Sequence, residues 1–167
     1  MAAPQSKKPT AAVRRAKLVK RPVQRPEPPP PPTKSVPGLT EPLVAIGYVT
    51  DAENKDLDSA IVAFRAAPAA AGPEGDFSDY AKPLLAFIDS HPKSNWNVAL
   101  WTNIGLGYYH SAYYTRAIEA YQKAWDAGRN ATNNKARLLV DRAVGELVRM
   151  HARLGHGKEL TALLKDI

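Results

Sequence analysis

Residues 98–131 read VALWTNIGLGYYHSAYYTRAIEAYQKAWDAGRNA, and this stretch decides the fold. Its first half contains W-x2-I-G-x2-Y, from Trp101 to Tyr108, and its second half contains A-x3-Y-x2-A, from Ala117 to Ala124. Gly105 and Ala117 remove side-chain bulk where two antiparallel helices would cross, while larger side chains fill the space beside the crossing. The spacing predicts two closely packed helices over 95–111 and 114–128, and Gly128 is expected to end the second with a positive φ.

Amphipathic patterns on both sides of this stretch predict further helices. Upstream, Thr50 and Glu53 have the spacing of a capping box, in which the Thr hydroxyl and the Glu carboxylate satisfy free amides at a helix start. Helices are expected over 51–66 and 77–90, the second capped by Asp76 or Ser78, with a Pro- and Gly-containing loop from Ala66 to Gly75 between them. Downstream, Thr132 or Asn133 is expected to cap a helix that runs to Leu154 and is broken by Gly155, His156 and Gly157. A last helix carries Leu160, Leu163, Leu164 and Ile167.

The chain resembles the tetratricopeptide repeat superfamily, closely over 98–131 and loosely over 51–92 and 132–167. This resemblance implies an all-α fold, a short α-solenoid of about six helices in antiparallel pairs over 51–167. It also implies a non-catalytic scaffold or adaptor for protein–protein interaction, since such repeats bind partner proteins or peptides in a concave groove. The motif specifies a mode of action and no particular partner.

The same resemblance assigns the groove to outward positions on the first helix of each pair. Those positions are Thr102, Asn103, Leu106, Tyr109 and His110 in one helix, and Arg142, Glu146, Arg149 and Arg153 in another. The last four lie on one helical stripe, where three guanidinium groups could bind the carboxylates of an acidic peptide. The alternative is a solvated face with internal Arg–Glu pairs. Tyr109 is either a flat groove contact or, with Tyr108, Tyr113 and Tyr114, part of the packing around the helix turn.

The N-terminal residues differ sharply from the rest of the chain. Eleven of the 15 prolines lie in the first 42 residues, and residues 1–34 hold nine of the 23 basic residues but one of the 16 acidic ones. Residues 1–35 are therefore expected to form a disordered basic arm, followed by an extended strap or short strand over 36–50. The arm is interpreted as a spacer, as a site for nucleic acid or an anionic membrane surface, or as a Pro-rich ligand for an aromatic-lined module. An organelle transit peptide is a further alternative.

Catalysis and cofactor binding find no support in the sequence. The chain has no cysteine, and its histidines, His91, His110, His151 and His156, lack the spacing of metal ligands. Gly105 and Gly107 fall inside a predicted helix and not in a phosphate-binding loop after a strand. We therefore expect no enzyme activity, no metal and no cofactor.

A second resemblance concerns the chain's wider context. Four segments look like the N-terminal helical part of large bacterial Rhs-type (tyrosine-aspartate repeat) proteins: His91–Ser94, Asn103–Tyr109, Ala143–Leu147 and Ala152–Gly155. This resemblance implies a structural N-terminal domain of a secreted assembly. The lack of a signal sequence or membrane span instead favours the cytoplasm. If the last helix leaves its leucines exposed, self-association, a partner or a downstream domain is expected at that end.

Overall fold

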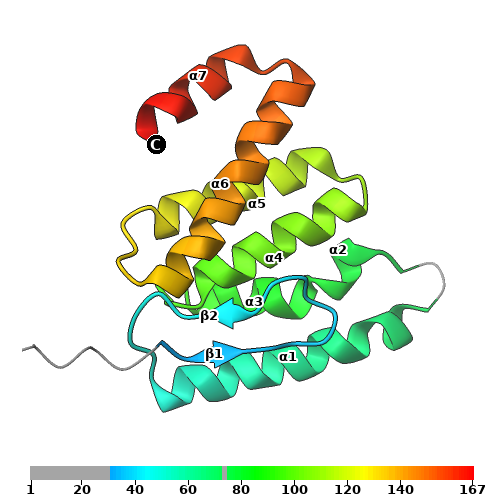
Figure 1. The fold of residues 1–167 in the computed structure, drawn as a ribbon. Coiled ribbons are helices and arrows are strands. Elements are labelled where there is room, and N and C mark those ends of the chain that lie inside the picture. Colours follow the sequence, from blue (N-terminus) through cyan, green and yellow to red (C-terminus); the bar gives the residue numbers. More distant parts are fainter. Residues whose placement is uncertain (1–30, 73–74) are drawn as a thin grey trace, which may run out of the picture.

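The computed structural model describes residues 31–72 and 75–167, and within these ranges the chain is mostly helical (Figure 1). The helices are α1 (Asp51–Ala71), α2 (Phe77–Tyr80), α3 (Lys82–Ser90), α4 (Asn97–His110), α5 (Tyr114–Gly128), α6 (Asn134–Leu154) and α7 (Gly157–Asp166). Two short strands, β1 (Thr33–Lys34) and β2 (Leu43–Val44), precede them. The predicted all-α fold is confirmed. In the ranges described, none of the helices combines the length and apolar character of a membrane span.

The helices stack from α1 at one end of the molecule to α7 at the other, with α4 and α5 in the middle (Figure 1). The α4–α5 contact is the most extensive in the fold. Gly105 permits it, because a Cβ there would lie 2.5 Å from Cε1 of Tyr121 on α5. Ala117 is fully buried in the same core. The close crossing that the sequence predicts is therefore present.

Side-chain caps define several helix starts. The Thr50 hydroxyl accepts a hydrogen bond from the Glu53 amide at 3.2 Å, as the capping pattern predicts. The Glu53 carboxylate, however, accepts a hydrogen bond from the Ser94 hydroxyl. Asp76 caps α2, and Asn133 caps α6 by accepting from the amides of residues 135 and 136. Gly155, with φ of 72°, ends α6 in the left-handed conformation.

Two predicted boundaries differ from the structure. The loop expected from Ala66 is helical as far as Ala71, with Pro68 inside the helix. This segment is rich in alanine, the strongest helix former, and Pro68 interrupts the backbone bonding only near the end of α1. The helix expected over 77–90 divides at Ala81 into α2 and α3, with Pro83 in the first turn of α3. Proline is tolerated there because first-turn amides have no partner within the helix.

Gly128 does not end α5 with a positive φ, and that expectation is wrong. The residue is the last helical position of α5, it is buried, and the residue that follows, Arg129, is also in the right-handed helical region. A Cβ on Gly128 would lie 2.5 Å from Cγ2 of Val140 and 3.1 Å from both γ carbons of Val98. The glycine is therefore needed for close approach, where α4, α5 and α6 meet.

Residues 31–50 form a strap across the helices, which turns at residues 37–38 and bends at residues 40–41 and 46–47. β1 and β2 pair antiparallel, with Thr33 opposite Val44 and Lys34 opposite Leu43. β2 is buried and contacts both α4 and α6. β1 falls within the stretch expected to be a disordered arm, and Lys34 forms an ion pair with Asp58 of α1. The rest of that arm, residues 1–30, lies outside the described residues.

The C-terminal helix turns only part of its apolar surface inward. Leu163 is buried and Leu160 partly so, whereas Leu164 and Ile167 are 59% and 64% exposed. Asp166 holds the end of α7 against α5, since its carboxylate accepts from the Trp125 indole at 3.2 Å and from Arg129 at 2.7 Å. The expected contact of this end with another copy, a partner or a further domain stays a prediction.

Candidate functional site

The α4 side of the predicted groove is not open. Thr102, Asn103 and Leu106, expected at outward positions, are 0%, 2% and 1% exposed. Apolar residues surround α4 instead of forming one stripe, as is typical of a helix enclosed by its neighbours. The Thr102 hydroxyl donates to the carbonyl of Val98 at 2.8 Å and is satisfied within the helix. The expectation of an open groove lined by Asn103 and Leu106 is therefore wrong.

The chain's own strap covers this side of α4. The Asn103 side-chain oxygen accepts from the Glu41 amide at 2.8 Å, and its nitrogen donates to the Glu41 carbonyl at 3.0 Å. The same nitrogen donates to the Ala99 carbonyl at 2.9 Å, which fixes the orientation of the side chain. Asn103 thus satisfies both main-chain groups of Glu41, which lies in a bend of the strap. Asn103, predicted to contact a partner, therefore binds the main chain of this protein's own strap.

The stripe of charged residues on α6 lies next to the strap. Glu146 is buried between two arginines, with its side chain 5% exposed, and Arg142 contacts it at 3.2 Å. Arg149 donates to the other Glu146 carboxylate oxygen. Arg142 also reaches the Glu41 carboxylate of the strap, at 3.9 Å. The internal Arg–Glu pairs of the alternative interpretation are therefore present for Arg142 and Arg149.

A buried hydroxyl completes the surroundings of this charged network. The Tyr121 hydroxyl is buried and has no hydrogen-bond partner among the described residues. Burial, followed by the nearby Glu146 carboxylate, raises the pKa of Tyr121 well above its ordinary value. The phenol therefore stays neutral, and it contributes no charge to the network.

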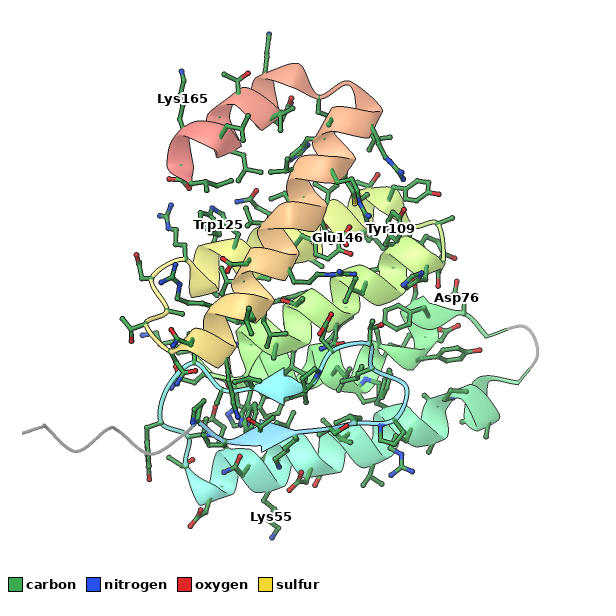
Figure 2. The ribbon with its side chains drawn as sticks, viewed as in Figure 1. Lys55, Asp76, Tyr109, Trp125, Glu146 and Lys165 are labelled. Atoms are coloured by element: carbon green, nitrogen blue, oxygen red, sulfur yellow. The ribbon has the colours of Figure 1, made fainter. Side chains whose placement is uncertain are left out.

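Tyr109 and Arg153 lie at the open end of the stripe. The Arg149 guanidinium carbon lies 5.5 Å from the centre of the Tyr109 ring, and Arg153 donates to the Tyr109 hydroxyl at 3.3 Å. Figure 2 shows Tyr109 and Glu146 on the same side of the molecule. A small cavity of about 190 Å³ is lined by Tyr109, Tyr114, Met150, Arg153 and Leu154. We call this site the Tyr109–Arg153 cavity.

The structure therefore brings together five of the nine predicted groove positions: Tyr109, Arg142, Glu146, Arg149 and Arg153. His110 is exposed beside them, with its ring centre 5.7 Å from that of Tyr109. Asn103 and Leu106 are enclosed. Sequence reasoning missed Glu41, Met150 and Leu154 as members of the site. The apolar residues on every face of α4 were the available signal that its outward side would be covered.

Other parts of the described chain offer no metal site. No group of three or more His, Cys, Asp or Glu side chains there could hold an ion. The His151 and His156 δ nitrogens lie 3.2 Å apart at the turn between α6 and α7.

A larger hollow of about 740 Å³ lies between α5 and α7, with both acidic and basic side chains around Leu163.

Comparisons with protein-family models, curated proteins and solved structures find no match to this chain. The tetratricopeptide and Rhs-type resemblances thus stay predictions from the sequence.

Proposed function

We propose that the protein is a non-catalytic interaction module that binds an extended acidic segment of a partner protein along the exposed stripe of α6. The observation that carries this proposal is the strap itself. A segment of this chain already lies against α4, with the main chain of Glu41 held by Asn103 and the Glu41 carboxylate facing Arg142. The strap occupies the beginning of the stripe and leaves Arg149, Arg153 and Tyr109 accessible.

The spacing of the arginines suits an extended ligand. At a helical rise of 1.5 Å per residue, Arg142 and Arg149 are about 10 Å apart along α6, and Arg149 and Arg153 about 6 Å. An extended chain advances about 3.3 Å per residue, so about two residues separate carboxylates that reach Arg149 and Arg153. Side chains two residues apart lie on the same face of an extended segment. An acidic residue at every second position therefore fits this part of the stripe.

The charges of the stripe also favour an acidic ligand. Three guanidinium groups face two carboxylates, Glu41 and Glu146. Arg153 pairs with no carboxylate of the described residues, and its guanidinium donates to the Tyr109 hydroxyl. Because a guanidinium carries five N–H donors, Arg153 retains donors for a carboxylate. Arg153 is therefore expected to contribute most to binding among the three.

Selection of random peptides on the immobilised full chain tests this proposal without knowledge of the partner. We expect enrichment of acidic peptides, and we expect Arg153→Glu to weaken their binding at least about tenfold, because it replaces attraction with repulsion. Arg149→Gln should weaken binding less, since Arg149 is partly neutralised by Glu146. Arg137→Glu is the matched control, because Arg137 is exposed on α6 but lines a different hollow, beside Trp125.

Circular dichroism should show the same helix content in all three variants. Enriched peptides without acidic residues would contradict the proposal. Equal loss of binding in Arg153→Glu and Arg137→Glu would contradict it as well, because it would indicate a general charge effect.

A further inference from the structure

The Tyr109–Arg153 cavity has the size of one side chain. Its volume is about 190 Å³. Pockets that enclose a whole small-molecule ligand are larger, about 300–1,000 Å³. The cavity is therefore too small for a cofactor or metabolite of ordinary size but large enough for one aliphatic or aromatic group.

The walls of the cavity are apolar, and its rim is cationic. Met150 is buried, while Tyr114 and Leu154 are 47% and 46% exposed. Tyr109 and Tyr114 lie with ring centres 5.9 Å apart. The Arg153 guanidinium lies at the hydroxyl end of Tyr109, and the Arg149 guanidinium lies near the face of the same ring. An occupant must then be apolar where it enters the cavity and anionic beside it.

We infer that the Tyr109–Arg153 cavity is an anchor subsite for one aliphatic or aromatic side chain of a partner's acidic segment, with a neighbouring carboxylate bound by Arg153. This inference rests on the proposed function and specifies its ligand: an acidic segment interrupted by an apolar residue. The apolar anchor supplies affinity through burial, while the arginines select the charge of the flanking residues.

The chemistry required, an apolar group next to a carboxylate, also occurs in a free N-acylated amino acid. Charge alone does not distinguish a peptide from an N-acylated amino acid, but the spacing of the arginines on α6 does. A peptide can contact Arg149 and Arg153 simultaneously, whereas a single carboxylate contacts one of them, since they are about 6 Å apart along the helix. We therefore assign the site to a segment of a protein.

Synthetic peptides titrated against the full chain test the inference by fluorescence polarisation. The probes are a labelled peptide of alternating glutamate and serine with leucine in place of one central glutamate, the same peptide with alanine in place of the leucine, and free N-acetyl-leucine as a competitor. The leucine then lies on the same face as its nearest glutamates. The leucine peptide should bind about tenfold more tightly than the alanine peptide. Leu154→Ala and Tyr114→Ala should each abolish most of this difference, because they remove a wall of the cavity.

Leu138→Ala is the matched control, since Leu138 is also on α6 and is 69% exposed but does not line the cavity. It should leave the preference for leucine unchanged. Equal affinity for the leucine and alanine peptides, with binding still dependent on Arg153, would overturn the anchor and leave the proposed function standing. Failure of both peptides to bind at millimolar concentration would contradict the two proposals together. Binding of N-acetyl-leucine as tight as that of the peptide would assign the cavity to a small molecule instead.

Discussion

Gly105 determines how closely α4 approaches α5. An added Cβ would lie 2.5 Å and 2.6 Å from two ring carbons of Tyr121, and that side chain is fully buried. We predict that Gly105→Ala lowers the free energy of unfolding by about 1–3 kcal/mol, the usual cost of overpacking a core. Urea denaturation measures the change.

Gly145 provides the matched control for this prediction, because it lies within α6 and a Cβ there would meet nothing within 4 Å. Gly145→Ala should raise the free energy of unfolding by about 0.5–1 kcal/mol, since alanine is the better helix former. A Gly105→Ala protein as stable as the Gly145→Ala protein would show that the α4–α5 crossing does not require glycine.

Asn103 shows where residue-level reasoning reaches its limit. The sequence correctly places Asn103 on α4, but the hydrogen-bond partner of its side-chain amide, the main chain of Glu41, lies 62 positions earlier. No local pattern indicates such a pairing, because the irregular strap has no periodicity that points to one helix face. The arginine stripe on α6 could be predicted, since helical spacing alone places residues 142, 146, 149 and 153 on one side.

Among the elements, helices with strong end signals could be predicted best. Asn133 and Gly155 bound α6 as the sequence indicates, because a side-chain cap and a left-handed glycine act locally. The positive φ predicted for Gly128 is wrong, since a glycine at a helix end can serve either a turn or a close contact. Only the neighbouring helix decides between these roles, and here Val140 of α6 requires the contact.

The turn between α6 and α7 is predicted to make stability depend on pH. His151 is buried, and burial lowers its pKa, with a further lowering by His156 and an opposing effect of Glu159. In the unfolded chain, His151 has the ordinary His pKa of about 6.5, so below that pH it binds more protons than it does in the folded chain. The contribution of neutral, buried His151 to the free energy of unfolding is therefore fully present above about pH 6.5. It is lost as the pH falls toward the lowered pKa of His151 in the folded state.

Thermal unfolding measured from about pH 7.5 down to about pH 5.5 checks this expectation. The melting temperature of the natural chain should fall over this range, and His151→Gln should make the fall smaller. His110→Gln is the control, because His110 is exposed. An unchanged pH dependence in the His151→Gln protein would show that protonation of this histidine does not oppose folding.

Across the whole molecule, the strap contacts three helices of the stack, α1, α4 and α6. β2 contacts α4 and α6. Gly38 lies beside α1, where a Cβ added to the glycine would be 3.3 Å from the Phe64 ring. The Ile46 amide also donates to the Asn95 carbonyl, just before α4, at 2.9 Å. The helices are therefore expected to unfold together with the strap in one cooperative transition.

Leu43, fully buried in β2, tests this cooperativity. Replacing it with alanine leaves a cavity between the strap and the helices, so Leu43→Ala should lower the free energy of unfolding by about 2–5 kcal/mol. Leu164→Ala removes the same atoms from a side chain that is 59% exposed, and it should change stability by at most about 0.5 kcal/mol. Far-ultraviolet circular dichroism and tryptophan fluorescence should give coincident denaturation curves for the Leu43→Ala protein. Separate transitions by the two methods would show instead that the strap can detach while the helical stack remains folded, and such detachment would open the α4 face around Asn103 to a partner.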